Sequence, residues 1–321
     1  MSADLDQAIF HDDEAARKWL EARIWPNGPV CPHCGVENEA TLMQGETTRP
    51  GLYQCNACRE PFTVTVGTLY ERSHIPLHKW LAATHLLMAS KKGMSTAQIG
   101  RMLDLPYKTA WFLTMRIRES FRDLFPEEAD KLGGNGKTAE ADATYVGGLW
   151  KNKHARRRPE RGLGPTHDKA PVFALVERGG KVRSFHVAEA NGANLREIVN
   201  AALDGDTVVY TDGDHTTRYA ASSFKTDFVN HSAGEYVRGD AHTNTVESYF
   251  AILKRGVIGT YHHVSQQHLK RYLAEFDYRY NERAALGVND AERMAKSVKG
   301  IVGKRLTYRR TGEREDEQIP Y

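Results

Sequence analysis

The chain has 321 residues, of which 40% are hydrophobic and 26% are charged, and its formal net charge is +3. This composition is near the globular average and excludes a collagen-like, coiled-coil or wholly disordered chain, whereas the length allows about two domains and a small additional module. Because no stretch approaches about 18 consecutive apolar residues and the first segment is acidic and helical in pattern, we expect no membrane span, no secretory signal and a cytoplasmic location.

A cysteine-containing module follows an N-terminal helix that we predict at residues 1–25. All four cysteines lie within residues 26–70, in two Cys-x-x-Cys pairs. Each pair directs two sulfur atoms at one point, so two pairs form a tetrahedral thiolate site for Zn²⁺. Disulfides are the alternative, which a reducing cytosol disfavours. We therefore predict a zinc ribbon, a module type that binds DNA, RNA or protein. The expected ligands of its structural zinc ion are Cys31, Cys34, Cys55 and Cys58.

Residues 71–126 are predicted to form a helix-turn-helix-like module. Apolar residues recur at helical spacing over residues 77–90, and two shorter helices follow, the second over residues 108–118. A recognition helix of this type enters the major groove of DNA, with phosphate contacts beside it. The alternative is a helical linker domain packed on its apolar side chains. The cations expected to contact DNA are Lys108, Arg116 and Arg118.

A glycine-rich linker leads to residues 137–285, which we predict to be an α/β domain with a mixed sheet. Strand patterns occur at residues 138–148, 172–176, 181–187 and 207–211, and a helix is predicted between the last two strands. This order of elements is that of an RNase H-like domain. Residues 286–321 are expected to be a C-terminal extension that is partly disordered.

Three acidic residues of this domain lie where such a domain needs them. Asp142 lies within the first strand, Asp212 ends the fourth, and Glu247 lies on a later helix. Three converging carboxylates can hold two Mg²⁺ or Mn²⁺ ions about 4 Å apart, an arrangement that catalyses in-line displacement at phosphorus. Asn244 lies one turn before Glu247 on the same helix face, and Lys254, two turns after Glu247, is expected to contact a phosphate. The alternatives are a simple Asp-Gly turn and a solvated helix face.

A basic segment lies between the first and second strands. Residues 151–169 contain seven Lys or Arg and two acidic residues. Cations beside a metal site can neutralise DNA phosphates and release counterions, so we favour DNA contact over a solvated loop. The residues expected to make this contact are Lys151, Lys153, Arg156, Arg157 and Arg158.

These motifs together resemble one known family. The two Cys-x-x-Cys pairs, the block at residues 140–148, the Asp-Gly turn at Asp212 and the helix with Asn244 and Glu247 look like those of bacterial insertion-sequence transposases that join a zinc ribbon to a DDE catalytic domain. The 34 residues between Asp212 and Glu247 are similar to the spacing in DDE enzymes. The resemblance covers residues 19–281, and it implies Asn244 as a reserve third ligand beside Glu247.

The resemblance implies a nucleoid-associated bacterial enzyme that binds the ends of an insertion sequence. It further implies metal-dependent cleavage of the DNA strand, attack of the freed 3′ hydroxyl on target DNA, and a homo-oligomer that holds two ends together. Two other functions remain open from the residues alone. One is a DNA-binding regulator or an inactive, domesticated transposase, and the other is an RNase H-like nuclease without strand transfer.

Overall fold

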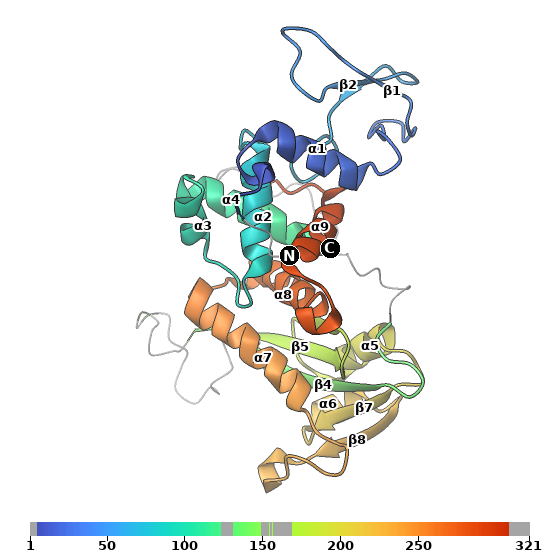
Figure 1. Ribbon diagram of the computed structural model, residues 1–321. Helices are drawn as coiled ribbons and strands as arrows, with labels where there is room; N and C mark the ends of the chain where they lie inside the picture. Colours follow the sequence, from blue (N-terminus) through green and yellow to red (C-terminus); the bar gives the residue numbers. More distant parts are fainter. Residues whose placement is uncertain (1–4, 123–130, 149–153, 155, 157–168, 308–321) are drawn as a thin grey trace.

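The computed structural model describes residues 5–122, 131–148, 154, 156 and 169–307. Figure 1 shows a small β ribbon at one end of the molecule, a group of helices in the middle and a mixed sheet at the other end. The predicted fold class, an RNase H-like mixed-sheet domain preceded by a zinc ribbon and a helical module, is confirmed. Within the described ranges, no helix combines the length and apolar character that crossing a membrane requires.

The N-terminal helix leads directly into the ribbon. Asp12 caps helix α1 (Asp13–Ile24) by accepting a 2.6 Å hydrogen bond from the Ala15 amide. A short 3₁₀ turn, Ala8–Phe10, precedes it. The ribbon is a three-stranded antiparallel sheet of β1 (Ala40–Leu42), β2 (Tyr53–Cys55) and β3 (Pro61–Phe62).

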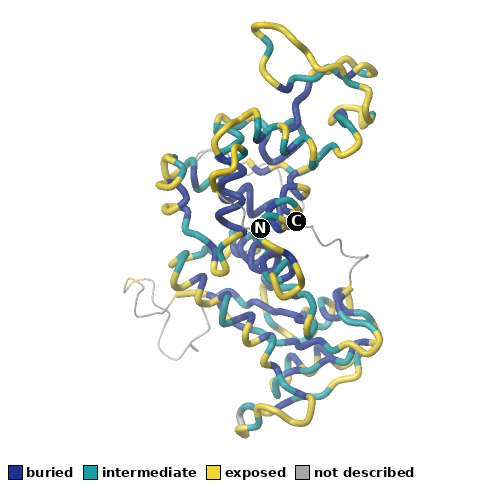
Figure 2. Tube along the Cα trace, in the orientation of Figure 1, coloured by how far each residue is buried: buried dark blue, intermediate teal, exposed yellow. Residues whose placement is uncertain are grey.

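The middle of the molecule contains the three helices predicted for residues 71–126. They are α2 (Leu77–Ala89), α3 (Thr96–Met102) and α4 (Tyr107–Ser120). Ser95 caps α3 through its hydroxyl, which accepts from the Gln98 amide. Figure 2 shows that α2 is buried along most of its length, because it lies between α1, α4 and the C-terminal helix α9 (Asp290–Ser297).

The C-terminal segment completes this helical module instead of forming a separate extension. Met294 of α9 and Val298 and Ile301 of the following 3₁₀ turn (Val298–Ile301) are buried in the same core as Trp80. The Leu69 amide also donates to the Ile301 carbonyl. Residues 290–301 of the predicted C-terminal extension therefore belong to the helical module, because their apolar side chains have a core to join. Residues 308–321 lie outside the described part.

The mixed sheet has the strand order β6-β5-β4-β7-β8. Strand β4 pairs antiparallel with β5 and parallel with β7, which in turn is parallel to β8. The bounds of the strands are Thr138–Val146 (β4), Ala170–Glu177 (β5), Val182–His186 (β6), Val208–Asp212 (β7) and Lys225–Val229 (β8).

Helices cover both faces of this sheet. Helices α5 (Gly192–Ala202) and α6 (His215–Ala220) pack on one face, and α7 (Asn244–Gly256) and α8 (Gln266–Asn281) on the other. The period-two pattern of β5 explains this, since Phe173 and Leu175 face α5 while Val172, Ala174 and Val176 face α7 and α8. A π-helical turn, Val257–Tyr261, extends α7, and a 3₁₀ turn, Ala284–Leu286, follows α8.

Helix α8 also protects the edge of the sheet. The backbone of the edge strand β6 pairs with side chains of α8: Asn281 accepts from the Val182 amide and donates to its carbonyl, and Asp277 accepts from the Ser184 amide. An unpaired strand edge invites aggregation, and these contacts occupy it. Tyr249 of α7 donates to the same Asp277 carboxylate, at 2.5 Å.

A buried charged cluster joins the helical module to the mixed-sheet domain. Glu275 of α8 is fully buried and accepts hydrogen bonds from Arg118 of α4, at 2.5 Å, from Arg279 and from Tyr261. Arg118 is likewise fully buried, and its guanidinium lies over the ring of Tyr272. One carboxylate therefore neutralises two buried guanidinium groups that belong to different parts of the chain.

Removing this carboxylate should strongly destabilise the protein. We expect Glu275→Gln to lower the free energy of unfolding by about 3–5 kcal/mol, because two buried cations lose their partner. Urea denaturation followed by circular dichroism measures the loss. Glu14→Gln, which removes an exposed carboxylate paired with Lys18, is the matched control and should leave the urea midpoint unchanged. A loss below about 1 kcal/mol for Glu275→Gln would contradict the central role of this cluster.

Candidate functional site

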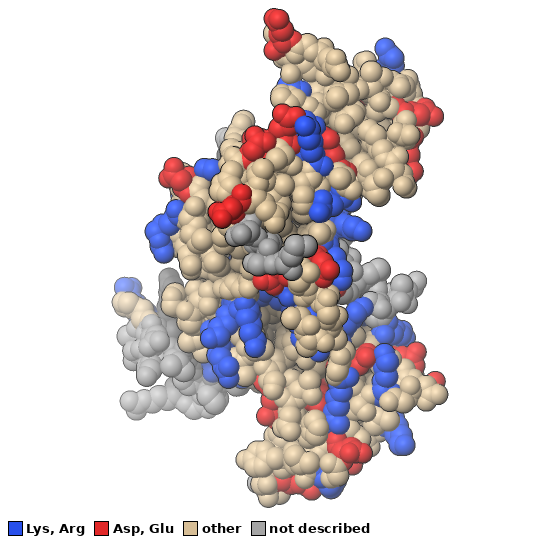
Figure 3. Space-filling view, in the orientation of Figure 1, with Lys and Arg blue, Asp and Glu red and all other residues tan. Residues whose placement is uncertain are grey.

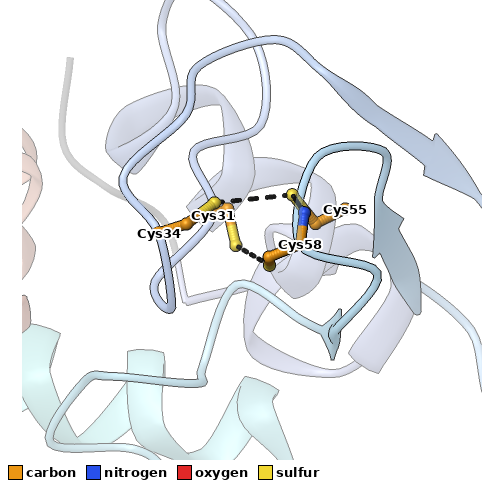
Figure 4. A group of neighbouring side chains, drawn as sticks. All are labelled: Cys31, Cys34, Cys55 and Cys58. Carbon is orange, nitrogen blue, oxygen red and sulfur yellow. Dashed lines mark hydrogen bonds between the residues drawn. The ribbon is translucent and has the colours of Figure 1, made fainter.

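The four cysteines converge as their spacing predicts. Their sulfur atoms all lie within 4.8 Å of one another, and Figure 4 shows the two Cys-x-x-Cys turns facing each other. The closest sulfur pairs join one turn to the other, at 3.7 Å between Cys31 and Cys58 and 3.6 Å between Cys34 and Cys55. Four thiolates from two such turns are the donor set of a structural zinc site, so the residues fit this ion.

The surroundings of the sulfurs support this function. The Cys58 amide donates to Cys55 Sγ, and this hydrogen bond lowers the pKa of the Cys55 thiol to about 7. Thiolate is the form that binds metal. Trp25 packs edge-on against Tyr53 and Phe62, which forms a very small apolar core beside the cysteines. A core of this size needs the additional binding energy that a metal ion provides.

The parallel pairing of β4 and β7 brings two of the predicted carboxylates together. Ala141 pairs with Thr211, so Asp142 and Asp212 follow at the same level on adjacent strands. Both line a cavity of about 260 Å³, together with Thr217 of α6. The Thr217 hydroxyl donates to Asp212 Oδ1 at 2.7 Å and so fixes the orientation of this carboxylate.

The environment of Asp142 disfavours its negative charge. Burial and, secondly, the nearby Asp212 carboxylate raise the pKa of Asp142 to about 7, and Glu247 contributes in the same direction. Lys254 acts in the opposite direction. Partly buried carboxylates that repel one another form a site that a cation would stabilise.

The third predicted carboxylate lies on α7 beside this cavity but does not line it. The Glu247 side chain is 46% exposed, and its Oε1 accepts a 2.8 Å hydrogen bond from the hydroxyl of Thr243. His231 Nε2 lies 3.7 Å from the same oxygen. Among the described residues, only the four cysteines place three or more possible metal-ligand atoms within 4.8 Å of one another. The carboxylate oxygens of Asp142, Asp212 and Glu247 therefore lie farther apart than this.

The other predicted residues of this site are accessible. Asn244 is exposed at the first position of α7, and Lys254 is exposed two turns after Glu247. Asp214, two residues after Asp212, also lines the cavity, and its carboxylate caps α6 by accepting from the Thr216 and Thr217 amides.

Two of the cations predicted to contact DNA are buried, which corrects that prediction. Arg118 is paired with Glu275 in the interior, and Arg116 donates to the carbonyls of Leu69 and Glu71. The reason is that the second half of α4 lies inside the helical module, so only its first turn reaches the surface. Lys108 is exposed on that turn, as the prediction requires.

The basic segment is largely outside the described residues, which include only one of its five predicted contacts. Arg156 is exposed. Those outside the described residues are Lys151, Lys153, Arg157 and Arg158.

The sequence analysis missed Glu140, which lies two residues before Asp142 on the same face of β4. Its carboxylate is fully buried and pairs with Arg178 at 2.7 Å. A second acidic residue at a period of two from Asp142, within an otherwise apolar strand, was the available signal. This signal does not indicate the partners of Glu140, because Arg178 and the first turn of α7 are distant from it in the sequence.

The zinc site leads to a direct test. We expect one zinc ion per chain, lost in Cys55→Ser, with faster hydrogen exchange across residues 31–62 and little change in the mixed sheet, which has its own core. Elemental analysis and hydrogen–deuterium exchange mass spectrometry measure these effects. His33→Ala is the control, since His33 is exposed and lies outside the cysteine cluster. Zinc-free wild-type protein with full protection of this segment would refute the prediction.

The raised pKa of Asp142 predicts a pH-dependent effect of Asp142→Asn. The folded state keeps a proton on Asp142 up to a pH of about 7, whereas the unfolded chain releases it near pH 4. Asp142 therefore lowers wild-type stability progressively between these values, by on the order of 4 kcal/mol above pH 7. We expect Asp142→Asn to raise the free energy of unfolding at pH 8, without added divalent metal, and to change it little at pH 4. Equal changes in the free energy of unfolding at pH 4 and at pH 8 would contradict this expectation.

Comparison with known proteins identifies the domains that carry these features. Residues 131–281 match the ISXO2-like transposase domain, and residues 11–60 match the transposase zinc-ribbon domain. The chain is 29% identical over 283 residues to a protein of Halobacterium salinarum described as an uncharacterized protein in transposable element ISH50, covering 84% of this chain and 91% of that protein.

A solved structure is also similar at a low level. It is the Mos1 transposase paired-end complex with left transposon end, with 11% identity, a TM-score of 0.27, and coverage of 68% of this chain and 74% of the other. The two domain matches lie in the order in which the ribbon and the mixed sheet are found in the structure. This chain belongs to the transposase family in which an ISXO2-like transposase domain is joined to a transposase zinc ribbon.

Proposed function

We propose that this transposase binds the ends of an insertion sequence and catalyses metal-dependent cleavage and transfer of DNA strands by a two-metal DDE mechanism. The observation that carries the proposal is the pair formed by Asp142 and Asp212, which lie at one level on adjacent parallel strands and line one cavity. Glu247 on the neighbouring helix α7 is the third acidic residue of the proposed site.

The donor set fits Mg²⁺ or Mn²⁺. Carboxylate oxygens are the ligands that these ions prefer. Burial and the repulsion from Asp212 raise the pKa of Asp142, and a cation bound between the carboxylates would relieve this repulsion. Asp142, Asp212 and Glu247 would hold the ions, with Asn244 in reserve. The contacts of Glu247 with Thr243 and His231 use Oε1, so we place the ion at Oε2 of this exposed carboxylate.

Bound divalent ions supply two effects at such a site, a lower pKa for the attacking water or hydroxyl and stabilisation of the leaving 3′ oxygen. The residues of the chain contribute orientation. Thr217 holds Asp212 in place, and Thr243 restrains Glu247. Lys254 shares the helix face of Glu247 and supplies a cation for the phosphate next to the cleaved bond. The 3′ hydroxyl released by the first displacement is the nucleophile of the second.

Exposed cations support a DNA partner. Figure 3 shows Lys and Arg side chains gathered over α7, where Lys254 and Arg255 are exposed. Lys108 and Arg156 are further exposed candidates, and Lys151, Lys153, Arg157 and Arg158 are proposed on sequence grounds alone. Because the reaction needs two element ends at once, we propose a homo-oligomer assembled on DNA.

The proposed function is tested by cleavage and joining of a labelled duplex that carries the element's own end, with Mg²⁺ or Mn²⁺. We expect nicked and joined products from the wild type. The cleavage rate should fall at least about 1,000-fold in Asp142→Ala, Asp212→Ala and Glu247→Ala, as it does when an enzyme loses a group that stabilises charge in the transition state. Asp206→Asn, which changes an exposed carboxylate in the turn before β7 that does not line the cavity, is the matched control and should keep activity.

The possible results separate the rival functions. Specific end binding without cleavage by the wild type would indicate a regulator or an inactive copy. Nicking without joined product would indicate a nuclease.

A further inference from the structure

Helix α7 lacks the usual cap at its N-terminus. Thr243 is the N-cap residue, yet its hydroxyl makes no capping hydrogen bond. The hydroxyl donates instead to Glu247 Oε1, at 2.8 Å. The amides of the first turn therefore need another acceptor, because four N–H groups at a helix start have no partner within the helix.

That acceptor is Glu140 of strand β4. Its Oε2 accepts from the amides of Thr245, at 2.7 Å, and Val246, at 3.0 Å, and its Oε1 accepts from the Thr245 hydroxyl, at 2.8 Å. A carboxylate at a helix N-terminus is also favoured by the helix dipole. A side chain of the sheet thus performs the capping function that frees Thr243 to hold Glu247.

Arg178 completes this anchor. Its Nε donates to Glu140 Oε1 at 2.7 Å, and its two terminal nitrogens donate to the carbonyls of Asp240, at 2.8 Å, and His242, at 3.0 Å. The guanidinium also lies over the ring of Tyr210, the residue that pairs with Glu140 across β4 and β7. The pair therefore touches both strands that carry the aspartates and the chain that leads into α7.

We infer that Glu140 and Arg178 are positioning residues that fix the rotation of α7 against β4, and so hold Glu247 where it can share a divalent ion with Asp142 and Asp212. Glu140 and Asp142 lie on one face of β4, two residues apart, and Glu247 follows the capped amides of Thr245 and Val246 directly. The inference rests on the proposed function for the ion itself, but the anchor is independent of it. Neither residue contacts the DNA in this scheme.

The test is Mn²⁺ binding by full-length protein, measured by titration calorimetry, together with hydrogen exchange of α7. We expect Glu140→Gln to weaken Mn²⁺ binding by about 10-fold to 100-fold, as for other groups that orient metal ligands, and to speed exchange at residues 244–247. Binding of end DNA should stay unchanged, and cleavage should recover at high Mn²⁺. Glu177→Gln is the matched control, because it removes another carboxylate of the same sheet, one that pairs with Lys137.

A second variant keeps the test decisive if Glu140→Gln does not fold. Arg178→Met should reproduce the loss of Mn²⁺ affinity, Arg178→Lys should restore part of it, and the double variant with Glu140→Gln should lose no more than either single variant. Unchanged Mn²⁺ affinity in a folded Glu140→Gln or Arg178→Met protein would overturn the inference. Wild-type protein that neither binds Mn²⁺ nor cuts DNA would instead overturn the proposed function, and this is seen without any variant.

Discussion

The parallel pairing of β4 with β7 is the contact on which the candidate site depends. These strands are separated in the sequence by two strands and a helix, yet their register places Asp142 and Asp212 at one level. Burial, and after it the repulsion between these two like charges, raises the pKa of Asp142. The backbone hydrogen bonds of the sheet hold the carboxylates together against that repulsion, which a bound cation would relieve.

Helix α7 reaches the site by a different mechanism. Its apolar side, with Val246, Phe250 and Leu253, packs on the sheet, which fixes the distance of the helix but only loosely its rotation and axial position. Directional contacts are needed to fix the rotation and axial position of the helix. The buried Glu140 carboxylate supplies such contacts through hydrogen bonds to the first turn of α7. A buried carboxylate is tolerable here because Arg178 and the helix amides satisfy it.

Buried arginines have a similar function between the two larger parts of the molecule. Arg118 and Arg279 share Glu275, and Arg116 satisfies carbonyls of the segment that follows the ribbon. Helix α8 contributes to both cores, with Tyr272 and Tyr278 in the helical module and Leu269 and Leu273 against the sheet. The helical module and the mixed sheet are thus connected by shared side chains as well as by the chain itself.

The sequence by itself determined the elements whose signals are local. The Cys-x-x-Cys spacing predicted a cluster that the structure assembles, helical periodicity predicted α2 to α4, and the order of strands and helices predicted the RNase H-like sheet. Asp142 and Asp212 were found as candidates because each has a recognisable place on its strand. These patterns depend on neighbouring residues, which a single sequence displays.

Only the tertiary structure decided which charges are buried and what they contact. Arg116 and Arg118 have the same local pattern as an exposed recognition helix, but α8 and the C-terminal segment cover that half of α4. In the sequence, Glu140 is one more acidic residue of a strand. Its partners, Arg178 and the first turn of α7, are distant in the sequence, and only the fold brings them into contact with it. The physical reason is that burial of a charge is set by partners brought together by the fold, and periodicity along the chain carries no information about them.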